Sequence, residues 1–102
     1  MAGRKRLEIA RALATSPRLL LLDEVMAGLT ATEVAEALAI LQRVQASRKL
    51  TIIIIEHVMR VLMRLCDRIV VLHHGEKIAE GAPAAIAQDP LVIDAYFGSR
   101  RP

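Results

Sequence analysis

The sequence predicts an α/β fold in which a parallel sheet is flanked by helices. Two observations lead to this prediction. The uninterrupted apolar runs Leu19–Leu22 and Ile52–Ile55 have the length and composition of buried strands. The segments around these runs space their apolar residues as helices do, so strands and helices alternate as in βαβ units. Because parallel sheets carry helices on both faces, we expect both strands to be buried on both sides.

The composition supports one small domain with an aliphatic core. The chain has 102 residues, of which 54% are hydrophobic and 2% are aromatic. The net charge is +3, but the excess basic residues lie at the two ends, in Arg4–Arg6 and Arg100–Arg101. A general nucleic-acid-binding surface is therefore poorly supported, and we expect no nucleic-acid partner. The single cysteine, Cys66, excludes an internal disulfide and a cysteine-rich metal site.

The first helix is predicted over residues 4–14. Its expected apolar stripe consists of Leu7, Ala10, Leu13 and Ala14. Pro17 ends this segment, because proline disfavours helix in the residue before it. The strand over residues 19–22 follows, and it runs directly into the adjacent carboxylates of Asp23 and Glu24.

These two carboxylates lie where open α/β sheets bind ligands, at the C-terminal end of a strand. Asp23 can hold a hydrated Mg²⁺, and Glu24 can orient or deprotonate a water molecule. The alternative is a buried strand that ends in two solvated acids. The six residues 19–24 alone do not decide between these interpretations.

The second helix is predicted to begin after Thr30, because Thr30 and Glu33 have the form of a capping box. Its expected buried stripe consists of Val34, Leu38, Leu41 and Val44. The next strand, Thr51–Ile55, is rich in β-branched residues and ends in the polar residues Glu56 and His57. Two neighbouring strands would thus both end in polar side chains.

The remainder of the chain is predicted to hold a short helix, a hairpin and two closing helices. Their predicted ranges are 58–66, 68–73 with 76–80, 83–88 and 90–97. Gly75 allows the positive φ of a tight hairpin turn. Pro83 and Pro90 suit the first turns of the two closing helices.

Taken together, these segments resemble the C-terminal half of the ATP-binding subunit of ABC transporters. Residues 1–15 resemble the helix that follows the family's signature motif, and residues 19–24 resemble its Walker B motif. Residues 27–29 resemble the D-loop, and His57 resembles the switch histidine. Residues 68–102 resemble the C-terminal hairpin and helices of the family. The resemblance implies a truncated P-loop NTPase-type parallel sheet, in which residues 1–102 form a partial ABC ATP-binding domain. Ile55-Glu56-His57 and the segment 92–98 are most similar to cassettes of branched-chain amino acid importers.

The resemblance also implies roles for individual residues. Asp23 would anchor Mg²⁺ through water, Glu24 would be the general base for the attacking water, and His57 would contact the γ-phosphate of ATP. Ala27, Gly28 and Leu29 would lie at the dimer seam. Gly3 and Arg4 would lie close to the nucleotide of the partner subunit. The implied partners are the N-terminal half with the phosphate loop, a second ATP-binding subunit and membrane permease subunits. The implied location is the cytoplasmic face of the inner membrane.

The chain departs from the family pattern at several points. No G-x-x-x-x-G-K-[ST] loop occurs, Gly3 stands where glutamine is usual, and Val25 stands where proline is common. Without the strand that feeds that loop, we expect an unpaired edge on 52–55 and a missing neighbour for 69–72. Two functions stay open: part of an importer ATPase, or an inactive truncated remnant or docking module. No apolar run is long enough to cross a bilayer, so we expect membrane contact only through a partner.

Overall fold

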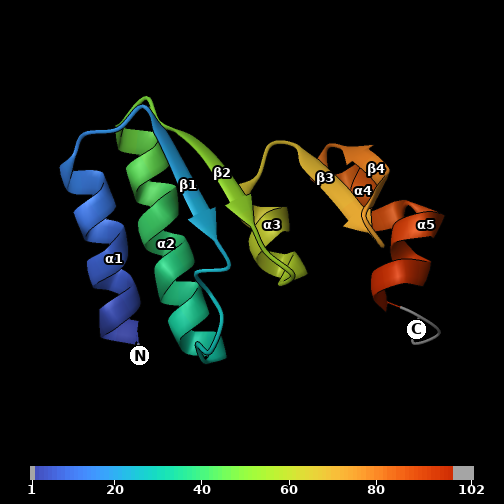
Figure 1. The fold of residues 1–102 in the computed structure, drawn as a ribbon, viewed down its shortest axis with the longest axis horizontal. Coiled ribbons are helices and arrows are strands. Elements are labelled where there is room, and N and C mark those ends of the chain that lie inside the picture. Colours follow the sequence, from blue (N-terminus) through green and yellow to red (C-terminus); the bar gives the residue numbers. More distant parts are fainter. Residues whose placement is uncertain (1, 98–102) are drawn as a thin grey trace. The chain divides into compact units, whose positions relative to one another are not determined.

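The computed structural model describes residues 2–97, in which helices and strands alternate as predicted (Figure 1). The elements are α1 (Ala2–Ala14), β1 (Leu19–Asp23), α2 (Ala31–Ser47), β2 (Thr51–Ile55), α3 (Met59–Leu65), β3 (Ile69–His73), β4 (Glu76–Gly81), α4 (Pro83–Gln88), α5 (Pro90–Val92) and a π-helical segment, η1 (Ile93–Phe97). The described residues divide into two compact units, one up to Val61 and one from Leu62 onward.

A parallel pair of strands forms the sheet of the first unit. The register pairs Leu19 with Thr51 at one end and Asp23 with Ile55 at the other. Because the strands run in the same direction, their C-terminal ends lie at the same rim of the sheet. The predicted parallel pairing is thus present, and it brings together the polar residues that follow the two strands.

Only one face of this sheet is covered among the described residues, so the expectation of burial on both faces is wrong. Leu20 and Leu22 are 4% and 5% exposed, whereas Leu21 is 67% exposed. On β2 the exposed side chain is Ile53, at 54%. The apolar runs fit a sheet that is buried on both sides, but the described part of the chain supplies a cover for one side alone. We call the face with Leu19, Leu21, Ile53 and Ile55 the open face.

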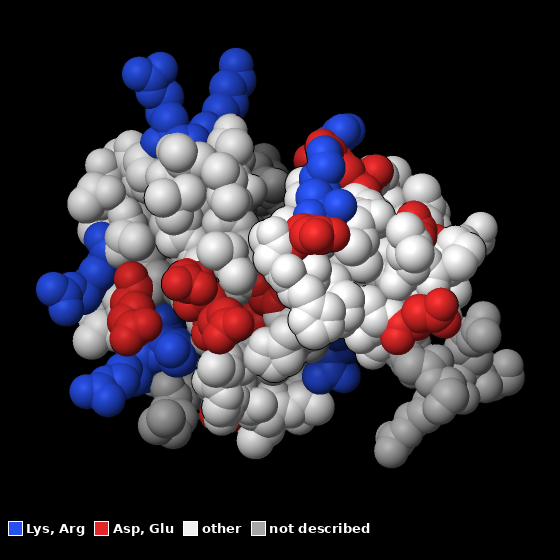
Figure 2. All heavy atoms as spheres, turned by 45° about the vertical axis from the view of Figure 1, so that its right-hand side comes forward, with Lys and Arg blue, Asp and Glu red and all other residues white. Residues whose placement is uncertain are grey.

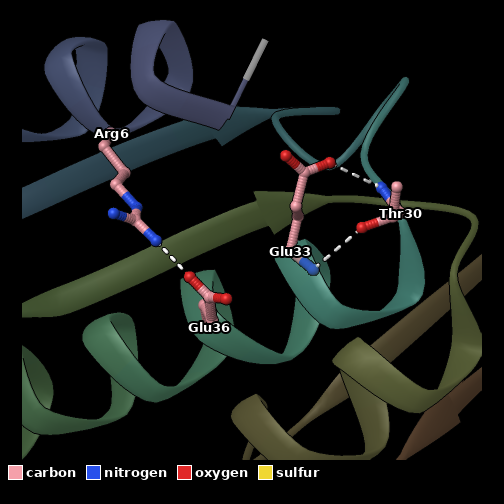
Figure 3. Close-up of polar contacts among 4 residues, drawn as sticks. All are labelled: Arg6, Thr30, Glu33 and Glu36. Carbon is pink, nitrogen blue, oxygen red and sulfur yellow. Dashed lines mark hydrogen bonds and ion pairs between the residues drawn. The ribbon is translucent and has the colours of Figure 1, made fainter.

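Two helices, α1 and α2, lie side by side in this unit (Figure 1). Arg6 on α1 forms an ion pair with Glu36 on α2 (Figure 3). The predicted capping box is present at the start of α2: the Glu33 N–H donates to Thr30 Oγ1 at 3.2 Å, and the Thr30 N–H donates to Glu33 Oε1 at 2.9 Å (Figure 3). The core residues of this unit are Ile9, Leu20, Leu22, Met26, Val34, Ala37, Leu38, Leu41, Leu50 and Val61.

The apolar stripe predicted for α1 needs correction. Leu7 is 58% exposed, whereas Ile9, outside the predicted stripe, is 6% exposed. The helical spacing fixed which residues share a face, but it did not show which face meets the rest of the unit. The stripe predicted for α2 is confirmed at Val34, Leu38 and Leu41, which are all buried.

The second unit contains the predicted hairpin of β3 and β4. The two strands are antiparallel, with a register shift between Val71 and Leu72, and Gly75 in the turn has a φ of +77°. Within residues 2–97, β3 pairs with β4 alone, as expected for a strand without its other neighbour. Ile86 and Val92 are buried in this unit. The predicted closing helix over 90–97 is a short α-helix followed by the π-helical segment, and residue 98 onward lies outside the described residues.

Candidate functional site

Three of the predicted site residues, Asp23, Glu24 and His57, lie where β1 and β2 end. Glu24 follows β1 directly, and the backbone N–H of Glu24 donates to the carbonyl oxygen of Ile55 at 2.8 Å. This hydrogen bond continues the pairing of the two strands by one residue. It therefore holds the start of the loop after β1 against the end of β2.

The carboxylate of Glu24 and the ring of His57 face each other across this rim. Glu24 Oε1 lies 3.9 Å from His57 Nδ1, and the side chains are 54% and 66% exposed. This separation is too long for a hydrogen bond, and an ion pair at such exposure is weak. Both groups therefore stay available to a ligand at the rim.

Glu24 also has an unusual backbone conformation. Its φ is +51°, in the left-handed region that residues with a side chain rarely adopt. The chain turns sharply there, and the Ala27 N–H donates to the Glu24 carbonyl oxygen at 3.2 Å. Residues held in this conformation at a strand end are common at functional sites.

The predicted seam residues, 27–29, lie in the loop between β1 and α2, residues 24–30, which we call the seam loop. Gly28 has a φ of +80°, and the Leu29 N–H donates to the Met26 carbonyl oxygen at 3.2 Å. Ala27 and Gly28 are exposed, and Leu29 is half-buried. A side chain at residue 28 would be strained by the positive φ even though no atom crowds the position.

Gly3 and Arg4 lie apart from this constellation, in the first turn of α1. Both residues are exposed, and within residues 2–97 no hydrogen bond or ion pair joins either of them to the strand ends. The structure therefore brings Asp23, Glu24 and His57 to one rim and does not link Gly3 or Arg4 to it.

One residue that sequence reasoning did not assign to the site is Glu56. Its Oε2 accepts a hydrogen bond from the Met26 N–H at 3.1 Å, so it ties the end of β2 to the seam loop. The signal was present in the strand alternation. Ile52 and Ile54 are the half-buried residues of β2, and Glu56 continues their side.

The chemistry of Asp23 fits one part of a Mg²⁺ site. Asp23 is exposed at the strand end, and Mg²⁺ is commonly held by one or two carboxylates together with phosphate oxygens and water. Within the described residues, no group of three or more histidine, cysteine, aspartate or glutamate side chains could hold a metal by itself. A metal at Asp23 would thus need ligands from a bound nucleotide.

A separate cavity of about 250 Å³ lies between α1, the seam loop and α2. Its lining is mainly apolar and includes Ile9, Leu13, Met26 and Ala37, with Lys5, Arg6 and Glu33 also present. Asp23, Glu24 and His57 do not line it. The cavity and the strand-end rim are therefore different features of the first unit.

Acidic and basic side chains are interspersed on the face drawn in Figure 2. The carboxylate of Glu80 on β4 forms two ion pairs, with Arg68 at 2.7 Å and with Lys77 at 2.9 Å. Within the described residues, no helix is long and apolar enough to span a membrane.

Comparison with solved structures shows the class of protein to which this fold belongs. Over 96% of its length, the chain superposes with a TM-score of 0.82 on the ADP conformation of MJ1267, an ATP-binding cassette of an ABC transporter, at 29% sequence identity. The chain covers 40% of that structure. Its α/β fold with a parallel sheet and flanking helices is therefore the fold of part of an ABC ATP-binding cassette, as predicted.

Comparison with known sequences shows which ATP-binding subunits this chain is similar to. The chain is 42% identical over 94 residues to BraF of Pseudomonas aeruginosa, a high-affinity branched-chain amino acid transport ATP-binding protein, and 39% identical over 97 residues to LptB of Acidithiobacillus ferridurans, a lipopolysaccharide export ATP-binding protein. These matches cover 92% and 95% of the chain but 37% and 40% of the relatives. The family described as branched-chain amino acid ATP-binding cassette transporter matches residues 76–101. The predicted resemblance to the C-terminal part of ABC transporter ATP-binding subunits, most like those for branched-chain amino acids, is thus confirmed.

Proposed function

We propose that this chain supplies the hydrolytic part of an ABC importer ATPase, which couples ATP hydrolysis to uptake of branched-chain amino acids. The observation that carries the proposal is the parallel pairing of β1 and β2, which places Glu24 Oε1 3.9 Å from His57 Nδ1 at one rim. This arrangement sets a carboxylate and an imidazole side by side at the end of the sheet, with both side chains more than half exposed. The similarity to BraF supports the assignment to a transport ATPase.

The proposed chemistry divides between three side chains. Asp23 would hold Mg²⁺, which would neutralise charge on the phosphates. Glu24 accepts a proton from the attacking water, and His57 donates a hydrogen bond to the terminal phosphate. Phosphoryl transfer mainly requires positioning and charge stabilisation, so a few groups held on two paired strands suffice once the phosphates are bound elsewhere.

A second ATP-binding subunit is the proposed partner at residues 27–29 of the seam loop. Ala27 and Gly28 are exposed, and the backbone of the loop is fixed by the hydrogen bond from Leu29 to Met26. Gly3 and Arg4, also exposed, would reach the nucleotide of that second subunit. Membrane permease subunits complete the proposed assembly and place it at the cytoplasmic face of the inner membrane.

The phosphate-binding part of the cassette is the proposed occupant of the open face. Leu21 and Ile53 are 67% and 54% exposed, and such a contiguous apolar face on a sheet is typical of a protein contact. The relatives extend well beyond the matched region, because the chain spans 37% of BraF. In the proposed assembly, a partner that corresponds to the unmatched part of such a relative would supply both the missing cover and the phosphate loop, a motif that does not occur in this sequence.

The substrate assignment rests on the C-terminal segment. The match to the branched-chain amino acid cassette family covers residues 76–101, whereas the lipopolysaccharide-export relative is nearly as similar over the whole chain. Leucine uptake by cells in which this segment replaces that of BraF tests the assignment. Loss of uptake with unchanged ATP hydrolysis would contradict it.

The test of the hydrolytic proposal is a fusion of the N-terminal part of BraF, up to the start of the match, with this chain. The fusion is expected to hydrolyse ATP, and Glu24→Gln is expected to lower kcat at least about 100-fold, the usual contribution of a general base. Glu8→Gln, at an exposed residue of α1 outside the site, serves as the control. A fusion that folds, binds ATP and shows no turnover would favour the alternative, an inactive docking module.

A further inference from the structure

Glu56 reaches from the end of β2 to the loop that follows β1. It lies between Ile55 and His57 in the sequence, and its Oε2 accepts the Met26 N–H at 3.1 Å. The side chain of Met26 is 2% exposed, so this hydrogen bond joins two segments at the edge of the core. The carboxylate of Glu56 is therefore directed inward, away from the exposed rim where His57 lies.

A second hydrogen bond joins the same two segments closer to the ends of β1 and β2. The Glu24 N–H donates to the Ile55 carbonyl oxygen at 2.8 Å, and the Met26 N–H donates to Glu56. Residues 24–26 are thus fixed to residues 55–56 at two successive points. Because Glu24 and His57 share no direct hydrogen bond at 3.9 Å, their separation is set by these two links.

Fold stability alone gives little reason for a carboxylate at residue 56. Glu56 Oε1 is buried and has no hydrogen-bond partner among the described residues. A buried acceptor without a partner costs free energy, and a negatively charged one costs more. An apolar side chain of similar length would avoid that cost, but it would leave the Met26 N–H without an acceptor.

From these contacts, we propose that Glu56 is a positioning residue for the ATPase site: it holds the seam loop through Met26 and thereby fixes the distance between Glu24 and His57. The inference rests on the proposed function, because the loop that Glu56 holds carries the proposed base and seam. Glu56 acts through the Met26 N–H in this proposal and is assigned no contact with the reacting atoms. What matters at residue 56 is an acceptor oxygen and not a charge, so glutamine is expected to replace glutamate, whereas methionine is not.

The structural half of the test uses the chain by itself. Amide hydrogen exchange is measured by NMR for Met26 and, as an internal reference, for Val34, whose N–H donates to the Thr30 carbonyl oxygen at 2.9 Å. Glu56→Met is expected to speed exchange at Met26 about fivefold to tenfold, the factor for one hydrogen bond, and to move the Glu24 amide and His57 ring signals. Val34 keeps its rate, and Glu56→Gln restores Met26. Unchanged Met26 exchange in Glu56→Met would overturn the proposal.

The functional half uses the fusion with the N-terminal part of BraF. Glu56→Met is expected to lower kcat roughly tenfold to a hundredfold with little change in KM for ATP, because misplacement affects the chemical step more than binding. Glu56→Gln is expected to keep most of kcat, and the matched control Glu8→Met to keep all of it. An equal loss in Glu56→Gln and Glu56→Met would overturn the acceptor role. A wild-type fusion without turnover refutes the proposed function. In that case the amide exchange of Met26 by itself tests whether Glu56 holds the seam loop.

Discussion

Replacing Leu21 and Ile53 together by threonine is expected to weaken the association of this chain with the N-terminal part of an ABC cassette. The two side chains are adjacent on the open face, because the strand register pairs residue 21 with residue 53. Threonine is itself β-branched and suits a strand, so the change acts on the apolar contact and not on the strand itself.

The size of the effect follows from the exposed fractions. Complete burial of a leucine or isoleucine side chain contributes about 1.5–3 kcal/mol. Leu21 has 67% of its surface left to bury and Ile53 has 54%, so the pair would lose about 1.8–3.6 kcal/mol of association free energy when both are replaced. Since about 1.4 kcal/mol is a factor of ten, the dissociation constant is expected to rise about 20-fold to 400-fold.

Isothermal titration of the N-terminal part of BraF into this chain measures the effect. Leu91→Thr is the matched control, because Leu91 is 59% exposed on α5 and lies in the other unit. The variant chain is also expected to stay soluble at higher concentration, since its open face is less apolar. Equal affinities for the wild-type and the double variant would refute the assignment of the open face to this partner.

Three further predictions concern the chain itself. Thr30→Ala, which removes the Oγ1 acceptor of the Glu33 N–H, is expected to lower the free energy of unfolding by about 1 kcal/mol in urea titration, and an unchanged midpoint would contradict the capping role. Hydrogen bonds from Lys77 and Arg68 hold the pKa of Glu80 below its usual 4.5, so the stability it contributes is present above that value and lost as the pH falls through the lower folded-state pKa. Glu80→Gln should therefore flatten the loss of thermal stability in acid. Burial raises the pKa of the Cys66 thiol above 9.0, so alkylation by iodoacetamide at pH 7.5 should be slower than for a free cysteine peptide, and equal rates would contradict this.

The elements of this fold could be predicted because their signals are local. The pair Thr30 and Glu33 marks the start of α2, and the structure shows both hydrogen bonds of the capping box. Gly75 marks the hairpin turn through its positive φ. The apolar run Leu19–Leu22 marks a strand. Each of these features depends on a few neighbouring residues, so sequence patterns capture it.

Burial was harder to predict because it depends on partners distant in sequence. The run Leu19–Leu22 is apolar at every position, which indicates two covered faces, yet Leu21 is largely exposed within the described structure. For α1, the spacing did not distinguish Leu7 from Ile9 as the residue that faces the core. The π-helical segment at Ile93–Phe97 reflects a shift in backbone hydrogen bonding, for which the sequence gives no comparable signal.

The candidate site was partly predictable, because some of its residues are marked by local sequence signals and others depend on contacts between distant residues. Asp23, Glu24 and His57 are identified by their place at strand ends, and parallel pairing then brings them together without further information. The link from Glu56 to Met26 could not be read in this way, because it joins residues thirty positions apart through a side chain. The alternation of β2 predicts that the side chain of Glu56 lies on the inward side of the strand. Which N–H donates to the Glu56 carboxylate depends on the shape of the seam loop.

The backbone of Glu24 connects these observations. A φ of +51° costs a residue with a side chain about 1–2 kcal/mol, and glycine would avoid that cost. The conformation persists because the hydrogen bond from Glu24 to Ile55 and the one from Met26 to Glu56 fix the backbone on both sides of the turn. Glu24→Gly should therefore keep or raise the stability of the chain while abolishing the proposed proton transfer. That combination would show that the glutamate is retained at residue 24 for its carboxylate, whereas a clear loss of stability would show that its side chain supports the fold.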